Sequence, residues 1–252
     1  MLKWLEAMYN KLVMKTAVIT GAGGDMGSYL VEALERQGVK CILVEREMDL
    51  LGHLVHMLDG NKHHFYKADF TNPKEIHCVI DDITSKHKKI DYLFNVAGVG
   101  IYKKLEDLTL SEWRASLDIN LNSVFMFSKG LLPLLKKSKD AMVLSFGSGM
   151  GVYPKANRVA YCTSKFALRG LSLTLSKEFG RRGVDFVLLT LGSVMTDFGT
   201  GGLIYRKKLK DNGKKYLSVD EVIKKVLEVT NSTSRKVEYS LFPQGYKKES
   251  KN

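Results

Sequence analysis

The sequence predicts an α/β domain built on a doubly wound, parallel, seven-stranded sheet. From Lys15 onward, short apolar runs alternate with longer segments of helical periodicity, which is the pattern of successive βαβ units. A chain of 252 residues with 44% hydrophobic residues can also bury one large core. Right-handed crossovers place helices on both faces of such a sheet and ligands at the carboxyl ends of its strands. We therefore expect a single domain over residues 14–252.

Each expected strand is a short apolar run bounded by glycine, proline or polar residues. The seven runs are Thr16–Thr20, Lys40–Val44, His64–Ala68, Asp91–Asn95, Met142–Phe146, Asp185–Leu191 and Val237–Phe242. The helices between them begin at capping signals, since an Ser, Thr or Asn side chain can accept from backbone N–H groups of the first turn. These signals are Thr71-Asn72 before Pro73, Thr109 with Glu112, and Ser218 with Glu221. Long helical patterns follow at Ser111–Leu135 and Ala160–Gly180.

The formal net charge of +12 could attract nucleic acid, an acidic membrane or an acidic partner. Most of the positive charge, however, is lysine in scattered pairs, without the interleaved arginine and aromatic residues that stack on bases. We expect a solvated lysine-rich surface and no nucleic-acid partner. Cys41, Cys78 and Cys162 are widely spaced, which fits reduced thiols in a cytoplasmic protein and gives no metal-type spacing. No metal site is expected.

No apolar run approaches the ~20 residues that span a bilayer, so no transmembrane segment is expected. Residues 1–13 do carry apolar side chains at helical spacing with lysines beside them. This extension could form a helix that packs on the domain or binds a membrane or partner, or translation could start at Met14 instead.

A glycine-rich loop follows the first strand and runs directly into a helical pattern, as a phosphate-binding loop does. Gly21 can make the tight turn, Gly24 can let the backbone approach a pyrophosphate, and Gly27 can let the helix pack on the strand. The helix amino terminus adds partial positive charge. The loop residues expected at a dinucleotide are Gly21, Gly23, Gly24, Asp25, Met26 and Gly27.

Asp25 places a carboxylate in this loop, where it has two possible roles. It can accept backbone N–H groups at the start of the helix and favour the helix dipole. If it turns inward, it weakens cofactor affinity. Both possibilities remain open from the sequence.

The end of the second strand bears on the choice of dinucleotide. Glu45 stands where a carboxylate accepts hydrogen bonds from the adenosine ribose hydroxyls, which indicates NAD. Arg46 could instead pair with a 2′-phosphate, which indicates NADP. We favour NAD, because a carboxylate beside a 2′-phosphate is the more costly arrangement.

The candidate catalytic group lies after the fifth strand. Tyr161 and Lys165 are four residues apart in a helical pattern, so their side chains share one face about 6 Å apart at Cβ. A nearby ammonium favours phenolate, which is expected to move the tyrosine pKa toward neutrality and make it a proton donor or acceptor. Ser148, upstream, could hydrogen-bond a substrate carbonyl.

Together these motifs resemble the short-chain dehydrogenase/reductase family, in its compact single-domain branch with a Rossmann-like fold. The resemblance covers Lys15 to about Phe242. The matching positions are the Thr20–Gly27 loop, Asp69, Asn95-Val96-Ala97-Gly98, Asn120, Ser148 and Tyr161-Cys162-Thr163-Ser164-Lys165.

The resemblance implies hydride transfer between the nicotinamide of NAD or NADP and a carbonyl or secondary-alcohol substrate. It makes Tyr161 the general acid/base, Ser148 the group that positions the reacting oxygen, Lys165 the holder of the nicotinamide ribose, and Asn120 the support of a water. Further cofactor contacts are implied at Asp69, Phe70, Asn95, Ala97, Gly98, Gly192, Val194 and Thr196. Substrate contacts are expected at Ser148, Met150, Tyr153, Tyr161 and Phe198.

Three positions depart from the family pattern: Asp25 replaces a glycine, Val96 replaces the second Asn of NNAG, and Leu191 precedes Gly192 in place of proline. The loop can also be read as GxxGxxG, which resembles the sugar-nucleotide epimerase branch, although we expect the shorter branch from the chain length. A catalytically idle dinucleotide sensor or scaffold is the alternative function. An interaction protein that binds nucleic acid or lipid is a further alternative.

Residues 199–216 follow the sixth strand, where the family places a substrate lid. The segment has six Lys or Arg against one Asp, so the substrate could be anionic or bound to an acidic carrier. The simpler alternative is a lysine-rich loop with its charges in water. The wide apolar faces of the two long helices resemble those that the family pairs across a two-fold axis, so a homodimer or homotetramer is expected.

Overall fold

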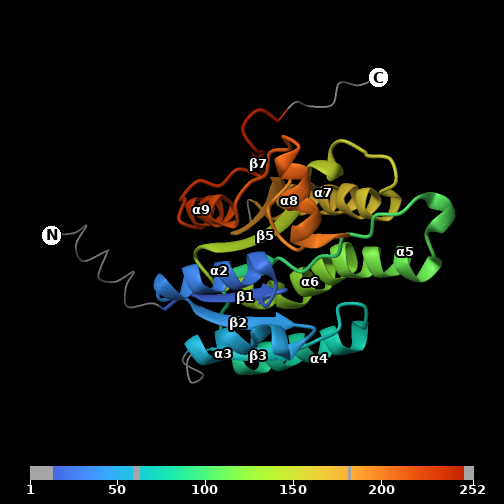
Figure 1. Ribbon diagram of the computed structural model, residues 1–252. Helices are drawn as coiled ribbons and strands as arrows, with labels where there is room; N and C mark the ends of the chain where they lie inside the picture. Colours follow the sequence, from blue (N-terminus) through green and yellow to red (C-terminus); the bar gives the residue numbers. More distant parts are fainter. Residues whose placement is uncertain (1–13, 59–62, 181–182, 247–252) are drawn as a thin grey trace.

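The computed structural model describes residues 14–58, 63–180 and 183–246 (Figure 1). The expected extension at residues 1–13 lies outside the described residues. Seven parallel strands form one sheet in the order β3-β2-β1-β4-β5-β6-β7. The strands are β1 Thr16–Thr20, β2 Lys40–Glu45, β3 His64–Lys67, β4 Tyr92–Asn95, β5 Ala141–Ser148, β6 Val184–Leu191 and β7 Glu238–Leu241. The predicted fold class is confirmed, and each strand boundary lies within two residues of its prediction.

Helices cover both faces of the sheet because alternate strand residues point to opposite sides. Ala17 and Ile19 of β1 pack with α2, α3 and α9, whereas Val18 packs with α4 and α6 on the other face. Figure 1 shows the sheet running between the two helical layers. The helices are α2 Asp25–Arg36, α3 Gly52–Met57, α4 Pro73–Lys86, α5 Leu110–Leu117, α6 Ser123–Leu135, α7 Val159–Phe179, α8 Gly202–Asp211 and α9 Val219–Thr230.

The predicted helix caps are present. Asn72 accepts a hydrogen bond from the backbone of Lys74 at 3.1 Å, and Pro73 occupies the first turn of α4. Full capping boxes begin α5, with Thr109 and Glu112, and α9, with Ser218 and Glu221. Since these contacts are local, the sequence alone was enough to predict them.

The helical pattern predicted over Ser111–Leu135 is interrupted. A π-helical turn, η3 Asp118–Asn122, separates α5 from α6 and contains the fully buried Asn120. The break directs the amide of Asn120 across to the chain after β4, where the backbone of Val99 donates to Oδ1 at 2.8 Å and accepts from Nδ2 at 3.0 Å. Such turns are often found at functional sites.

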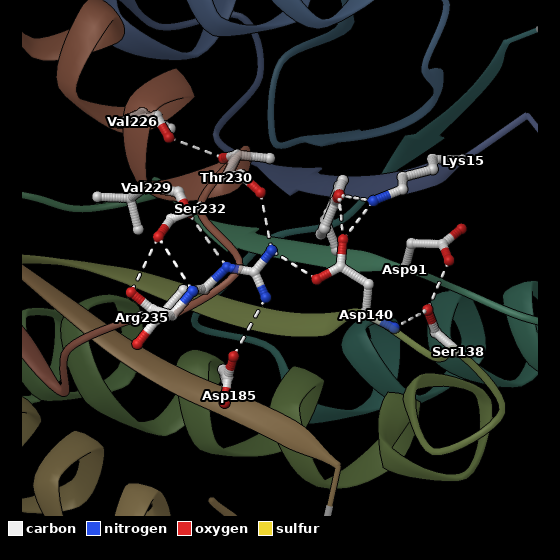
Figure 2. Close-up of polar contacts among 12 residues, drawn as sticks. Lys15, Asp91, Ser138, Asp140, Asp185, Val226, Val229, Thr230, Ser232 and Arg235 are labelled. Atoms are coloured by element: carbon white, nitrogen blue, oxygen red, sulfur yellow. Dashed lines mark hydrogen bonds and ion pairs between the residues drawn. The ribbon is translucent and has the colours of Figure 1, made fainter. Parts of the chain in front are cut away.

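A buried ion network closes the edge of the sheet where the strands begin (Figure 2). The Arg235 guanidinium lies between Asp140, which precedes β5, and Asp185 of β6, with N–O distances of 2.6 and 3.1 Å. It also donates to the carbonyls of Val229 and Thr230 at the end of α9. Only 4% of the Arg235 side chain is exposed. This arginine therefore ties α9 to two strands at the edge opposite their carboxyl ends.

Among the residues that the structure describes, no helix combines the length and apolar character needed to cross a bilayer.

Candidate active site

The candidate site residues gather at the carboxyl ends of the central strands. Thr20 of β1 pairs in register with Asn95 of β4, which pairs with Ser145 of β5, and Ser148 of β5 pairs with Leu191 of β6. The glycine loop, the Asn95–Gly98 run and the segments after β5 and β6 therefore leave the sheet along one edge. Parallel pairing brings together stretches that are far apart in the chain.

The glycine loop is shaped by two close approaches. Gly21 has φ +68°, and a Cβ there would lie 2.7 Å from the backbone of Ala97. At Gly27, a Cβ would lie 2.0 Å from the carbonyl oxygen of Gly21. Both positions thus exclude larger side chains, and α2 begins directly against the end of β1.

The carboxylate of Glu45 is fixed against this loop. The backbone of Gly23 donates to Oε2 at 2.9 Å, and the backbone of Arg46 donates to Oε1 at 2.8 Å. Glu45 is buried, whereas the Arg46 guanidinium pairs with Glu47 at 2.6 Å on the surface. Glu45, which indicates NAD, is therefore buried beside the glycine loop, whereas Arg46, which indicates NADP, lies on the surface with a carboxylate partner.

Asp25 does not cap its own helix, contrary to one of the two roles considered for it. It lies in the first turn of α2, where no side-chain cap bond forms at Gly24. Its Oδ2 instead accepts a hydrogen bond of 2.6 Å from the backbone of Asp197, after β6. Asp197 Oδ1 in turn accepts from the backbone of Leu203 at the start of α8. Asp25 thus connects the glycine loop to the segment that leads into α8.

Side-chain contacts within the described chain hold Asp69, Phe70 and Asn95, which were also expected at the cofactor. Asp69 accepts from the backbone and hydroxyl of Thr71, both at 2.8 Å, and so caps the turn before α4. The ring of Phe70 packs edge-on against Phe127 in the core. Asn95 donates to Ser145 at 3.3 Å, while its buried Oδ1 has no hydrogen-bond partner among the described residues.

Tyr161 and Lys165 share one buried face of α7, as predicted. Ser148 lies close enough to Tyr161 to act on its pKa, and the backbone of Met150 donates to Ser148 Oγ at 3.1 Å. Lys165 Nζ lies 5.8 Å from the centre of the Tyr161 ring and donates to the carbonyl of Phe146 at 2.8 Å. Ser148, Tyr161 and Lys165 therefore form one cluster between β5 and α7.

The predicted lowering of the tyrosine pKa does not occur. Burial raises the pKa of Tyr161, Tyr102 adds to that rise, and Ser148 opposes it. Burial also lowers the pKa of Lys165, to about 8. Desolvation of two buried side chains outweighs their attraction here, because the ammonium is directed at a backbone carbonyl and not at the phenol.

Asn120 completes the cluster from the π-helical turn. Its Nδ2 donates to Ser164 Oγ of α7 at 2.9 Å, one residue before Lys165. A Cβ on Gly98 would lie 3.2 Å from Asn120 Oδ1 and 3.8 Å from Lys165 Nζ. Gly98, Asn120 and Lys165, which all belong to the family's motifs, are thus neighbours in space.

Two aromatic rings lie against Tyr161. The ring of Tyr102, from the loop after β4, meets it edge-on with centroids 5.4 Å apart, and the ring of Phe198 lies 5.9 Å away. The Arg158 guanidinium stacks on the outer side of Tyr102, 3.7 Å from the ring centre. Phe198 was predicted; Tyr102 and Arg158 were not.

The remaining predicted residues have no described contact with Tyr161. Met150 belongs to the short helix η4 Gly149–Gly151, and Tyr153 donates its backbone N–H to Gly149. After β6, Gly192 packs tightly on Phe242 and Pro243, while Val194 and Thr196 are buried.

A family model described as short chain dehydrogenase matches residues 15–201. The chain belongs to this family. It is accordingly an oxidoreductase of the class that interconverts CH–OH and C=O groups, and the predicted family resemblance is confirmed.

Characterised relatives of this short-chain dehydrogenase are moderately similar. It is 27% identical to D-threitol dehydrogenase of Mycolicibacterium smegmatis over 187 residues, which cover 73% of this chain and 72% of the relative. It is also 27% identical to the 3-oxoacyl-[acyl-carrier-protein] reductase FabG of Salmonella typhimurium over 183 residues, which cover 73% and 75%.

Solved structures agree on the fold. An alcohol dehydrogenase from the archaeon Thermococcus sibiricus, complexed with 5-hydroxy-NADP, superimposes with a TM-score of 0.84 at 26% identity and covers 94% of this chain and 100% of its own. The closed form of a serine dehydrogenase complexed with NADP+ gives 0.85 at 20% identity, covering 94% and 98%, which indicates the shared fold alone.

The sequence analysis did not predict Tyr102 and Arg158 as site residues, because neither lies in one of the family motifs found in the sequence. The available signal was weak: an aromatic residue follows Gly98 closely, and a lone arginine stands one helical turn before Tyr161. Only the packing of the loop after β4 against α7 brings the two side chains together.

Proposed function

We propose that this protein is an NAD(P)-dependent oxidoreductase in which Tyr161 is the general acid/base for a carbonyl or secondary-alcohol substrate. The observation that carries the proposal is the buried cluster in which Tyr161 lies beside Lys165 and close to Ser148. It lies at the same sheet edge as the glycine loop. The test is the oxidation of NADH or NADPH by a panel of ketones and aldehydes, with dinucleotide affinity measured separately by calorimetry. Dinucleotide binding without turnover on any carbonyl would instead favour an idle sensor or scaffold.

The residues present fit a dinucleotide. A Cβ on Gly24 would meet nothing closer than 3.6 Å, so the loop leaves room at the amino terminus of α2, where N–H groups and the helix dipole favour phosphate. The orphaned Oδ1 of Asn95 and the backbone of Gly98, which lies close to Asn120 and Lys165, are further along the same edge. We assign the phosphates to the Gly21–Gly27 loop and the nicotinamide end to the side of Gly98 and Lys165. Relatives solved with NADP or NADH support this assignment.

In the reductive direction the nicotinamide, when bound, supplies the hydride that adds to the carbonyl carbon. Ser148 donates a hydrogen bond to the carbonyl oxygen and holds it beside Tyr161. The Tyr161 hydroxyl gives its proton to that oxygen as the C=O π bond breaks, and the phenolate regains a proton from solvent. Lys165 stabilises this phenolate through its charge, and Asn120 holds α7 and the loop after β4 in register.

Glu45 supports a preference for NADH, which is part of this proposal. Its carboxylate is held in place by Gly23 and Arg46 backbone groups and would lie beside a 2′-phosphate, while Arg46 is occupied by Glu47. We expect NADH to bind at least about tenfold more tightly than NADPH, which corresponds to roughly 1.4 kcal/mol. Glu45→Gln keeps an acceptor for Gly23 but removes the charge. In calorimetric titrations of this variant, the ratio of the Kd for NADPH to the Kd for NADH should therefore decrease. Tighter binding of NADPH by the wild type would contradict the assignment.

Asp25 is expected to weaken dinucleotide binding through its negative charge at the phosphate loop. Asp25→Gly should therefore lower the Kd for NADH by about three- to tenfold, as expected for one unfavourable surface charge. Asp25→Asn is the matched control, since it removes the charge but keeps an oxygen for the Asp197 N–H. Tightening in both variants assigns the effect to charge. Weaker binding in both would show that Asp25 supports the site.

The expected homodimer or homotetramer remains a proposal. Phe125 on α6 and Phe166 on α7 are large exposed apolar side chains on the two helices that members of this family pair, and they support it. The cytoplasmic location also stays a prediction.

A further inference from the structure

Four cationic side chains converge beside the candidate active site from two separate segments. Lys155 and Arg158 precede α7, whereas Arg206 lies in α8 and Lys214 follows it. Lys155, Arg158 and Arg206 all act on Lys214 through their charge. Arg206 also lies within electrostatic range of Tyr161. The predicted lysine-rich segment therefore brings part of its charge inward to the catalytic cluster.

Arg158 is the cation that contacts Tyr102. Its guanidinium carbon lies over that ring, 3.7 Å from the centre, and the centre of the ring is 5.4 Å from that of Tyr161. Its Nε is buried and has no hydrogen-bond partner among the described residues. A guanidinium held over an aromatic ring can still present its fork of N–H donors to a carboxylate or phosphate, which suits bidentate binding.

Arg206 and Lys214 share a second ring, that of Tyr216, at 5.8 and 5.0 Å from its centre. Arg206 is fixed by donating to the backbone carbonyls of Val194 and Phe198, so it holds the segment after β6 in place. Lys214 is exposed and has no such anchor among the described contacts. Burial lowers the pKa of Lys214, and Lys155, Arg206 and Arg158 lower it further.

Three of these cations, Arg158, Arg206 and Lys214, have no acidic partner among the described residues. Like charges held together without a counter-charge repel one another, and an anion placed among them removes that cost. The rings of Tyr102 and Tyr216 attract these cations but do not neutralise their charge, so an anion would still gain by binding there.

We propose that Arg158 and Lys214 bind an anionic group, a carboxylate or a phosphate, of the same small molecule whose carbonyl is reduced at Tyr161. The proposal rests on the proposed function and names its substrate class. One small molecule suffices, because the Arg158 guanidinium and the Tyr161 ring both contact the ring of Tyr102, at 3.7 and 5.4 Å from its centre. A long carrier-linked substrate does not need the anion so close to the reacting carbonyl.

The test compares substrates that differ only in the anion. The pairs are 4-oxopentanoate with its methyl ester, 3-oxobutanoate with its methyl ester, and dihydroxyacetone phosphate with dihydroxyacetone, each with NADH. We expect kcat/KM to be about ten- to a hundredfold higher for at least one anionic member, as for a charge-assisted hydrogen bond. Arg158→Met and Lys214→Met should each reduce that ratio to a few-fold, mainly through KM. Lys208→Met, which removes one exposed charge from α8, should leave the ratio unchanged.

Binding gives a second readout that does not depend on turnover. With the protein saturated in NAD+, calorimetry should show tighter binding of the anionic member of a pair, lost in Arg158→Met and weakened by salt. Equal kcat/KM and equal affinity for all pairs would overturn the anion site and leave the oxidoreductase proposal standing. Anion binding without turnover of any carbonyl would sustain the site and overturn the proposed function. A preference for a 3-oxoacyl carrier protein over all free oxo acids would overturn the small-molecule proposal.

Discussion

Replacing Tyr161 by phenylalanine should lower kcat by about a thousandfold, within the range of general acid–base catalysis, and leave the Kd for NADH within about threefold. The change removes one hydroxyl, the group that we propose exchanges a proton with the substrate beside Ser148. The ring itself remains, so its packing against Tyr102 and Phe198 is preserved. Steady-state rates and calorimetric affinities, measured on the same preparations, check both halves of this expectation.

Tyr29→Phe is the matched control, because Tyr29 is an exposed tyrosine on α2, distant in sequence from the cluster. It should retain wild-type turnover. If Tyr161→Phe kept more than about a tenth of the wild-type kcat, another group would have to move the proton, and the assignment of Tyr161 would be wrong.

Replacing Arg235 by methionine should cost about 3 kcal/mol of unfolding free energy. Removing Arg235 leaves Asp185 without its cation, whereas Asp140 keeps Lys15. Breaking a buried ion pair by removing one partner typically costs 3–5 kcal/mol. We expect the lower end because the side chains of Asp140 and Asp185 are 38% and 42% exposed. Urea unfolding monitored by circular dichroism measures the change. Because the network lies at the edge of the sheet opposite the cluster, turnover per folded molecule should persist.

Arg36→Met is the control for Arg235. Arg36 forms an exposed i,i+4 pair with Glu32 at 3.1 Å, so its loss should change stability by at most about 0.5 kcal/mol. An equally small loss in Arg235→Met would mean that the buried network contributes nothing net. Acid should weaken the same network: Lys15 and Arg235 outweigh the effect of burial and hold the pKa of Asp140 below its usual value. The stability that Asp140 contributes is therefore present at neutral pH and is lost as pH falls through that lowered pKa.

The structural features that depend on residues close together in the chain could be predicted from the sequence. The strand runs, the caps at Asn72, Thr109 and Ser218, and the i,i+4 placement of Tyr161 and Lys165 depend on periodicity and on contacts within a few residues. Such features can be predicted because the backbone period and the unpaired N–H groups of a helix start impose them.

Tertiary packing determined the rest. Asp25 meets the backbone of Asp197, Arg158 stacks on Tyr102, and Glu45 is fixed by Gly23, all pairs that are far apart in the chain. The pKa of Tyr161 also depends on tertiary packing. The sequence placed an ammonium near a phenol and predicted a lowered tyrosine pKa, yet burial raises it, because desolvation depends on everything packed around the group.

The sequence by itself therefore determined the fold class, the family and the identity of the candidate catalytic residues, since these lie in local patterns in a fixed order. Only the tertiary structure decided which way Asp25 points, that Tyr102 and Arg158 lie beside Tyr161, and that Arg206 and Lys214 share the ring of Tyr216. The physical reason is that parallel strand pairing brings distant loops to one edge, where burial and charge depend on side chains that no local pattern connects.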